Sequence, residues 1–205
     1  MRFLYVMDPM CGWCYAFQPE LEGFLARHPS AEVDWIMGGL APDTNEPMDD
    51  ALKQTIASYW HKIEAVSQVT FNHDFWERNT PYRSTYAACR AVIAAERLRK
   101  VSSASMVKSI QSAYYQHAKN PSLEDTLVAC ASDIGFDAAQ FLGALRSDDT
   151  EQLFQQHLSV VHQLQVTGFP ALFLTDEQNR AYPLAVGFTP TAELHQRFGQ
   201  ITGSK

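Results

Sequence analysis

Two cysteines near the start of the chain, Cys11 and Cys14, have the residue type and the spacing that redox chemistry requires. They follow a short apolar run at residues 3–7 and open a segment with helical periodicity. Two thiols separated by two residues can pass between a dithiol and a disulfide. The N-terminus of a helix carries partial positive charge and free N–H groups, which favour a thiolate on the first cysteine. The pattern therefore predicts a redox site in which Cys11 is the nucleophile and Cys14 resolves the mixed disulfide.

A structural zinc site is the competing interpretation of a C-x-x-C pair. Such a site needs four ligands, and the two other cysteines, Cys89 and Cys130, are far apart in the sequence and far from any second C-x-x-C. Each lies on an apolar helical stripe, so we expect both to be small residues of the core. The seven histidines show no ligand spacing. The sequence thus predicts no metal site.

Composition and charge limit the classes of partner. The chain has 205 residues, of which 46% are hydrophobic, which is enough for a large core. Its formal net charge of −7 argues against nucleic acid and anionic membranes as partners, because both select basic faces. No apolar run approaches the roughly 20 residues of a membrane-spanning helix. The first predicted strand leaves no room for a signal peptide before it, so we expect a cytoplasmic protein, in which a redox pair is catalytic or sensing.

The pattern of apolar residues places these cysteines in an α/β core that a helical block interrupts. The core elements are predicted, in chain order, at 2–7 (strand), 11–26 (helix), 31–37 (strand), 171–175 (strand), 181–186 (strand) and 191–200 (helix). Pro183 indicates a bulge or an edge position in the last strand. Between the second and third strands the periodicity is helical, with helices predicted at 49–67, 84–98, 102–117, 123–134, 138–145 and 149–165. We therefore expect one domain made of residues 1–45 and 166–205, and a helical insertion domain at 46–165.

This order of elements, with a C-x-x-C pair at the start of the first helix, resembles the thioredoxin fold. Pro19 stands eight residues after Cys11, where thioredoxins carry a helix-kinking proline, and residues 166–171 (Val-Thr-Gly-Phe-Pro-Ala) are similar to the cis-proline loop beside the thioredoxin cysteines. The helical insertion between the second and third strands resembles the DsbA-like branch. Within that branch, residues 8–15 (Asp-Pro-Met-Cys-Gly-Trp-Cys-Tyr) and 82–96 are most similar to the cytoplasmic FrnE group and the related hydroxychromene-carboxylate isomerases.

The resemblance implies a thiol–disulfide oxidoreductase that reduces or isomerises disulfides through a mixed disulfide on Cys11. Its substrates would be disulfide-containing proteins or small thiols, with no bound cofactor and with glutathione as a candidate co-substrate. The alternative is a glutathione-dependent isomerase or transferase of the same fold. Those relatives usually carry a serine at the first motif position and need no second thiol. The presence of both Cys11 and Cys14 therefore favours redox chemistry.

Four further residues are expected to contact the substrate. The resemblance implies that Pro170 forms a cis peptide bond with Phe169 beside the cysteines, and that Gly168 permits a tight approach of this loop. The backbone at Phe169 would then pair with an extended substrate, as in strand addition. Trp13 would be exposed at the rim of the site as a contact surface.

Other positions near the motif leave alternatives open. Asp8 is either a turn or cap residue before the helix or a proton relay for Cys14. Tyr5 occupies the strand position where thioredoxins and DsbA proteins keep a buried acid, and the Gly-Trp dipeptide puts no histidine inside the motif. A group of aromatic residues in the insertion either lines a groove or belongs to the core: Phe71, Phe75, Trp76 and Tyr82.

Overall fold

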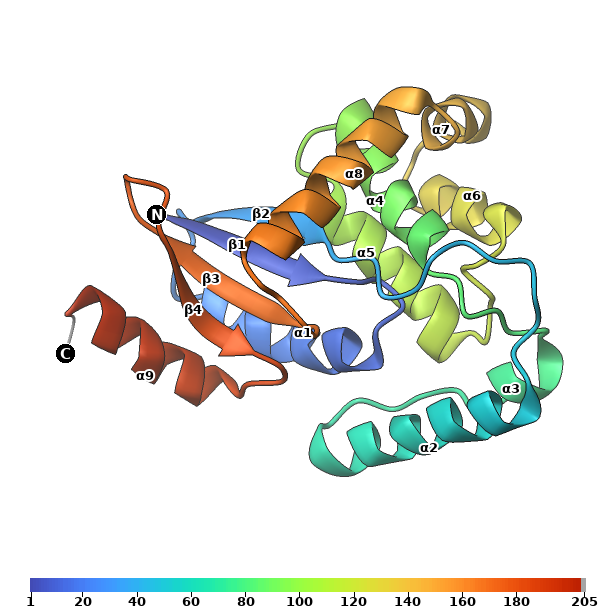
Figure 1. The fold of residues 1–205 in the computed structure, drawn as a ribbon, viewed down its shortest axis with the longest axis horizontal. Helices are drawn as coiled ribbons and strands as arrows, with labels where there is room; N and C mark the ends of the chain where they lie inside the picture. The colour runs from blue at the N-terminus through green and yellow to red at the C-terminus, as the bar shows by residue number, and fades with distance from the viewer. Residues whose placement is uncertain (204–205) are drawn as a thin grey trace.

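The sheet whose strand β1 leads toward the dithiol has four strands in the order β2-β1-β3-β4 (Figure 1). The computed structural model describes residues 1–203. Strand β1 (Arg2–Met7) pairs in parallel with β2 (Glu32–Met37) and antiparallel with β3 (Ala171–Thr175), which pairs antiparallel with β4 (Ala181–Val186). The expected α/β fold, strand-helix-strand followed by strand-strand-helix, is confirmed.

Two helices of the core pack against each other beside the sheet. Helix α1 (Gly12–Leu25) forms the crossover between the parallel strands β1 and β2, and α9 (Thr191–Thr202) follows β4. The backbone N–H and the hydroxyl of Thr191 donate hydrogen bonds of 2.6 and 2.7 Å to the carboxylate of Glu20. This carboxylate therefore satisfies a free donor at the start of α9 and ties that helix to α1.

Along the chain, the helical block follows β2 and precedes β3, as expected (Figure 1). Its helices are α2 (Asp50–Val66), α3 (Phe75–Arg78), α4 (Tyr86–Leu98), α5 (Ser103–Gln111), η1 (Ser112–Gln116), α6 (Glu124–Asp133), α7 (Ala138–Leu145) and α8 (Asp148–Gln163). The single helix expected at 102–117 instead changes from α5 into the π-helical turn η1. The sequence missed α3 because four residues are too few to show periodicity. The domain boundaries at residues 45 and 165 stay a prediction.

Strand β1 lies in the middle of the sheet and is buried on both of its faces. Tyr5, Val6 and Met7 are all fully buried. The ring of Tyr5 packs against Phe17 of α1 and Trp35 of β2, with centroid distances of 5.8 and 5.1 Å. This is the environment that an uncharged apolar strand favours, and it fixes the strand that leads into the dithiol.

The lone cysteines and the aromatic residues of the insertion belong mostly to the core. Cys89 and Cys130 are at most 1% exposed, as expected of small core residues. Trp60 of α2 stacks on Phe71 at 4.9 Å and packs against Phe75 at 5.7 Å. Both phenylalanines are buried, so the core alternative holds for them, while Trp76 and Tyr82 are half-buried.

Pro183 lies at an irregular point of the edge strand β4. Leu172 of β3 is opposite Ala185, whereas the next residue of β3, Phe173, is opposite Pro183. Leu184 is therefore the extra residue of a β-bulge. Because proline cannot donate a hydrogen bond to a neighbouring strand, a bulged edge strand is where it is tolerated, and this expectation is confirmed.

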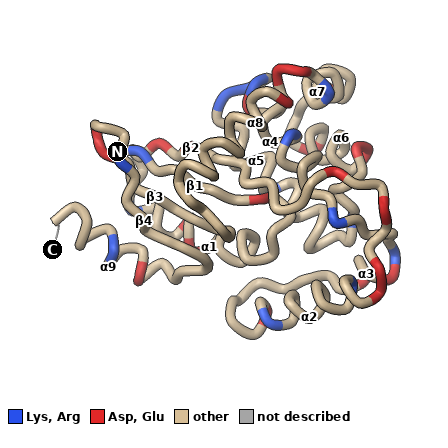
Figure 2. The backbone as a smooth tube through the Cα atoms, in the orientation of Figure 1, with Lys and Arg blue, Asp and Glu red and all other residues tan. Residues whose placement is uncertain are grey.

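The charged residues of the chain are scattered over the fold. In Figure 2, the Lys and Arg positions lie among the Asp and Glu positions rather than together on one face. Within residues 1–203, no helix combines the length and the apolar character that crossing a membrane would require.

Candidate functional site

The two thiols of the motif lie at the N-terminus of α1. Cys11 is the N-cap residue, with an extended backbone (φ −85°, ψ 117°), and its N–H donates a 3.0 Å hydrogen bond to the carbonyl of Asp8. Cys14 lies within the first turn of the helix. Both are free cysteines. The first thiol therefore belongs to the residue at the helix end where free N–H groups and partial positive charge lie, although its side chain makes no capping hydrogen bond.

The two thiols differ in their access to solvent. Cys11 keeps 7% of its surface exposed, whereas Cys14 is completely buried. Burial, together with the neighbouring Cys11 thiol, raises the pKa of Cys14 well above its usual value, although the backbone of Asp8 opposes this effect. Cys14 is therefore a neutral thiol at neutral pH, and Cys11 is the thiol that an incoming molecule meets first.

The loop at residues 166–171 passes beside Cys11. The Sγ atom of Cys11 lies 3.7 Å from the carbonyl oxygen of Phe169, and the Phe169–Pro170 peptide bond is cis. The carbonyl of Pro170 accepts a 2.7 Å hydrogen bond from the N–H of Gly187, just after β4. These contacts bring together the cysteine motif and a loop that is distant in the sequence.

The glycine that permits a close approach in this region is Gly38 rather than Gly168. A Cβ atom at Gly168 would meet no atom within 4 Å, so the expected tight approach at that residue is absent. A Cβ atom at Gly38, just after β2, would lie 2.3 Å from the Cε1 and Cζ atoms of Phe169. The ring of Phe169 therefore rests directly on the backbone of Gly38. Nothing in the sequence indicated this contact.

Trp13 is at the edge of the site but is half-buried rather than fully exposed. Its ring packs against Phe188, with centroids 6.0 Å apart. Phe188 lies between β4 and α9 and was not among the expected site residues, because nothing in the sequence places that connection near the motif.

Asp8 is completely buried and joins the turn before Cys11 to the helical block. Its carboxylate accepts hydrogen bonds from the N–H groups of Met10 (2.8 Å) and Leu40 (2.7 Å). It also accepts from the hydroxyl of Thr85 at 2.6 Å and from the thiol of Cys89 at 3.4 Å. Burial raises the pKa of Asp8, although these four hydrogen bonds oppose the rise.

The contacts of Asp8 show that it stabilises the turn before Cys11, as one of the two alternatives predicted. They also show that it connects this turn to helix α4. The bond to Met10 is the local bond of an Asx-type turn, whereas Thr85 and Cys89 belong to the start of α4. Cys89 was expected only as a core residue. Its spacing of four residues from Thr85 puts both on one side of a helix, but the sequence does not show that Asp8 lies opposite.

Two buried tyrosine hydroxyls lie close to the dithiol. The hydroxyl groups of Tyr5 and Tyr115 have no hydrogen-bond partner within residues 1–203. Burial raises the pKa of Tyr5 well above its usual value, and the thiols of Cys14 and Cys11 raise it further. Burial also raises the pKa of Tyr115, with smaller contributions from neighbours that include the same two thiols. The position where related folds carry a buried acid thus holds a neutral hydroxyl.

Helix α2 and the segment after it form one wall beside the motif. A Cβ atom at Gly12 would lie 2.8 Å from Cδ1 of Ile63 and 3.7 Å from Cζ of Phe71. The ring of Tyr15 packs against Phe71 at 5.3 Å and stacks on Tyr115 at 4.6 Å. The small Gly12 is therefore the residue that lets this aromatic wall approach the dithiol.

A separate groove of about 1080 Å³ lies beyond Tyr15, between α1 and the helices α5, η1 and α6. Its lining includes Gln18 and Glu22 of α1 and Lys108 of α5, but neither Cys11 nor Cys14. The groove therefore adjoins the motif without containing the reactive sulfurs.

A dithiol at the start of the first helix of this sheet, beside a proline loop and a helical insertion, defines a protein of the DsbA-like class with a thioredoxin fold. The sequence profile of the DSBA-like thioredoxin domain matches residues 4–199, so the chain belongs to that family. The recognition made from the residue pattern is thereby confirmed.

Solved structures of several oxidoreductases and isomerases share this fold. A proposed protein disulfide isomerase from Nitrosomonas europaea is 25% identical, with a TM-score of 0.88 over 98% of this chain and 97% of that one. The cytosolic disulfide reductase DsbM from Pseudomonas aeruginosa is 22% identical, with a TM-score of 0.80 over 99% and 98% of the two chains. A 2-hydroxychromene-2-carboxylate isomerase is 16% identical, with a TM-score of 0.66 over 98% and 96%.

Among curated sequences, the ClpXP adapter protein SpxH of Bacillus subtilis is 22% identical over 181 residues, which cover 88% of this chain and 60% of that protein. The SpxH protein of Halalkalibacterium halodurans is 22% identical over 176 residues, or 83% and 57% of the two chains. The matches thus span about three fifths of the length of these curated relatives.

Proposed function

We propose that this protein is a thiol–disulfide oxidoreductase that reduces or isomerises disulfides through Cys11 and Cys14. The observation that carries the proposal is the asymmetry of the two thiols at the helix N-terminus. Cys11 keeps 7% of its surface exposed and its sulfur lies near the carbonyl of Phe169, whereas Cys14 is completely buried. Such an arrangement suits one thiol that attacks the substrate and one that can react only with the first.

The reaction transfers two electrons from the dithiol to the substrate. The Cys11 thiolate attacks one sulfur of a substrate disulfide, which forms a Cys11–substrate disulfide and releases the other substrate sulfur as a thiolate that takes up a proton. Cys14 then loses its proton and attacks the sulfur of Cys11. The second substrate thiolate leaves and is protonated, and the protein holds a Cys11–Cys14 disulfide. In isomerisation, a substrate thiolate attacks the mixed disulfide instead, and Cys11 is released.

The proton of Cys14 needs an acceptor, because burial keeps this thiol neutral. We propose Asp8 as the relay, since burial raises the pKa of its carboxyl group. A carboxylate with a raised pKa is a better base than an exposed one. The hydroxyl of Tyr5 is the second polar group beside Cys14, and it can donate a hydrogen bond to the thiolate as that thiolate forms.

The expected substrate contacts lie in the motif itself and in the loop whose Phe169 carbonyl is 3.7 Å from the sulfur of Cys11. We propose that Gly168, Phe169 and Pro170 present their backbone to an extended substrate, as in strand addition, and that Trp13 with Phe188 forms an apolar contact beside it. Glutathione fits as the co-substrate that restores the dithiol, because two molecules of it supply the two electrons and form one disulfide. The relative DsbM, a cytosolic disulfide reductase, has also been solved with GSH, which supports both this co-substrate and a cytoplasmic location.

Trapping of the mixed disulfide tests the proposal. In Cys14→Ser, the resolving thiol is absent, so Cys11 should remain linked to its substrates. Cell extracts from a strain that expresses this variant would be separated under denaturing, non-reducing conditions, and the linked proteins identified by mass spectrometry. The matched control is Cys11→Ser, which retains only the buried thiol and should trap nothing. Equal trapping by the two variants would reverse the assigned roles.

The glutathione-dependent isomerase remains the alternative function. Its support is the structural similarity to the 2-hydroxychromene-2-carboxylate isomerase, which shows that the two proteins share a fold. The insulin-reduction assay separates the two functions, because a dithiol reductase needs both cysteines, whereas an isomerase that uses bound glutathione needs no second thiol. Insulin reduction by the unmodified protein and its loss in Cys14→Ala would support the reductase, and no reduction by either would favour the isomerase.

A further inference from the structure

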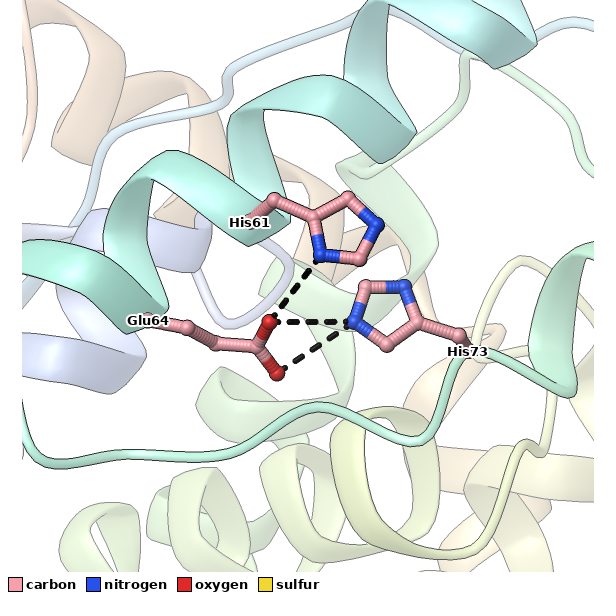
Figure 3. A group of neighbouring side chains, drawn as sticks. All are labelled: His61, Glu64 and His73. Atoms are coloured by element: carbon pink, nitrogen blue, oxygen red, sulfur yellow. Dashed lines mark hydrogen bonds and ion pairs between the residues drawn. The ribbon is translucent and has the colours of Figure 1, made fainter.

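Three side chains with the chemistry of metal ligands, none of them part of the dithiol motif, converge at α2 and the segment after it. Figure 3 shows His61 and Glu64 on the helix and His73 on the segment after α2, with their polar atoms turned toward one another. Their candidate ligand atoms all lie within 4.8 Å of one another. The sequence did not predict this group, because the pattern H-x-x-E is short and His73 is brought back by the fold.

The local structure fixes the three side chains in place. His61 and Glu64 are three residues apart on α2 and therefore project from the same side of the helix. The ring of His73 stacks on that of His61, with centroids 4.1 Å apart and planes inclined by 11°. One oxygen of Glu64 also accepts a 2.8 Å hydrogen bond from the backbone N–H of Phe71, so the carboxylate is held between the helix and the returning segment.

The three side chains are open to ions from the solvent. The side chain of Glu64 is 25% exposed, that of His73 33% and that of His61 68%, so water and ions can reach the group.

The distances from the two imidazole nitrogens to the Glu64 carboxylate match those between neighbouring ligand atoms of a small metal ion. Nδ1 of His61 lies 3.3 Å from Oε2 of Glu64, and Nε2 of His73 lies 3.2 Å from the same oxygen. Zinc–nitrogen and zinc–oxygen bonds of about 2.0–2.1 Å in a tetrahedron place neighbouring ligand atoms about 3.3–3.4 Å apart. An ion that binds between the three groups would therefore keep the nitrogen–carboxylate distances close to those of the free protein, provided that each imidazole is unprotonated at the nitrogen that faces it.

We propose that His61 Nδ1, His73 Nε2 and the Glu64 carboxylate form a binding site for a divalent transition metal of the Zn²⁺ type. Two imidazoles and one carboxylate are a ligand set of zinc sites, and water would complete the coordination. The nitrogen ligands exclude Mg²⁺ and Ca²⁺, which prefer oxygen. The site requires no thiol and is independent of the redox chemistry proposed above.

The bound ion would clamp the segment after α2 onto that helix. The same segment carries Phe71, and α2 carries Ile63, the two residues that approach Gly12 of the motif. Trp60 of α2 stacks on Phe71 and lies against His73 at 5.8 Å. Packed side chains therefore connect the metal site to the motif, and the ion would stiffen the wall of the redox site.

Calorimetric titration with Zn²⁺ tests the proposal. The protein is first reduced and treated with iodoacetamide, so that the accessible thiol of the motif cannot bind the ion. One Zn²⁺ should bind per chain, whereas Mg²⁺ and Ca²⁺ should not. His61→Gln and His73→Gln should each weaken Zn²⁺ binding by more than about 100-fold, because even the loss of an outer-shell partner costs about 10–100-fold.

Two matched variants complete the titration. Glu64→Gln keeps an oxygen that can accept from the N–H of Phe71 but loses the charge, so it should also weaken binding. His162→Gln removes an exposed imidazole from α8, distant in sequence from the group, and should leave the affinity unchanged. Equal affinity of the unmodified protein and His73→Gln would overturn the proposal, as would the absence of stoichiometric binding.

X-ray absorption spectroscopy of the same iodoacetamide-treated protein, loaded with one equivalent of Zn²⁺, gives a result that does not depend on whether a variant folds. The expected first shell contains only nitrogen and oxygen, with the multiple-scattering signal of two imidazoles. Sulfur in that shell would place the ion on cysteines instead and would overturn the assignment.

Discussion

Single residues around the dithiol determine which thiol attacks the substrate and which resolves the mixed disulfide. The roles of Cys11 and Cys14 could be predicted from the sequence, because their spacing and their position after an apolar strand are visible in one short segment. Their buried partners do not: Thr85 and Cys89 reach Asp8 only through the packing of α4 against the motif turn. A carboxylate and a thiol that are far apart in the chain give no local pattern, so no spacing rule could have found this contact.

The hydroxyl of Tyr5 gives a prediction about the resolving step. It lies beside Cys14, and a hydrogen bond to a charged group lowers the pKa of an acid by stabilising its ionised form. Tyr5→Phe should therefore raise the pKa of Cys14 further and slow the resolution of the mixed disulfide. The expected slowing is at least about tenfold, since such bonds contribute about 1.5–3 kcal/mol.

Single-turnover reduction of a fluorescent glutathione disulfide, followed at several pH values, measures this effect. The rate of resolution should rise with pH in both proteins, because Cys14 must lose a proton, and the curve of Tyr5→Phe should lie at higher pH. Urea unfolding of the reduced variant should show no loss of stability, because the hydroxyl has no partner in the described part of the fold. Tyr182→Phe, whose hydroxyl donates to Asp176 on the edge hairpin, is the control, and coincident curves for Tyr5→Phe and the unmodified protein would contradict the prediction.

At the scale of helices and strands, the sequence predicted the elements better than their contacts. All four strands lie within one residue of their expected bounds, because short apolar runs bounded by turn residues are distinct. The π-helical turn at Ser112–Gln116 was missed, since its residues continue the pattern of the preceding helix. The close contact between the end of β2 and the loop at residues 166–171 was missed as well, because a glycine does not reveal what packs against it.

The contact between Gly38 and Phe169 predicts the effect of one methyl group. In Gly38→Ala, the new Cβ would overlap the ring of Phe169, which must then move away. The carbonyl of Phe169 lies 3.7 Å from the sulfur of Cys11, so its displacement should lower kcat/KM for disulfide reduction by about 10- to 100-fold, as a misplacement of about 1 Å can do.

The matched control for this variant is Gly143→Ala in α7, where the added Cβ would meet no atom within 4 Å. Alanine in place of a glycine within a helix should stabilise the protein by about 0.5–1 kcal/mol and leave the activity unchanged. Insulin reduction and urea unfolding of both variants give the comparison. Full activity of Gly38→Ala would show that the position of the ring is irrelevant to catalysis.

At the scale of the whole molecule, the helical block is joined to the sheet through a few buried polar contacts. Asp8 is one of them, and His157 of α8 is another: its Nδ1 accepts a 3.0 Å hydrogen bond from the N–H of Met37 at the end of β2. The sequence predicted that helices interrupt the core, since the change in periodicity is clear, but it did not predict how they dock. The packing of the helical block on the sheet depends on contacts between residues that are distant in the chain. The residues next to them in the sequence form no motif that would reveal these contacts.

His157 predicts a dependence of stability on pH. Burial lowers the pKa of this histidine, although the charge of Asp34 opposes the effect, so the folded protein binds its proton less readily than the unfolded chain. As the pH falls through the unfolded value of about 6.5, protons favour the unfolded state. The free energy of unfolding should therefore fall, by at most about 1.4 kcal/mol per pH unit from this residue.

Urea unfolding at pH 7.5, 6.5 and 5.5 tests this prediction in the unmodified protein and in His157→Gln. Glutamine does not titrate, so the variant should lose less stability between the highest and the lowest pH. Burial also lowers the pKa of His28 and His195, but both histidines remain in the two proteins and cancel in the difference. If the free energy of unfolding changed equally with pH in the two proteins, His157 would not contribute to the pH dependence.

The ring of Phe169 on the backbone of Gly38 also has an evolutionary consequence. Two positions that are distant in the sequence share one small volume, so neither can change freely without the other. Lineages that acquire a side chain at the position of Gly38 should carry a smaller residue before the loop proline, and lineages that retain glycine there are free to keep an aromatic ring. Residues 38 and 169 should therefore covary among related sequences. In the laboratory, the same coupling should appear as recovery of activity when Phe169→Ala is added to Gly38→Ala.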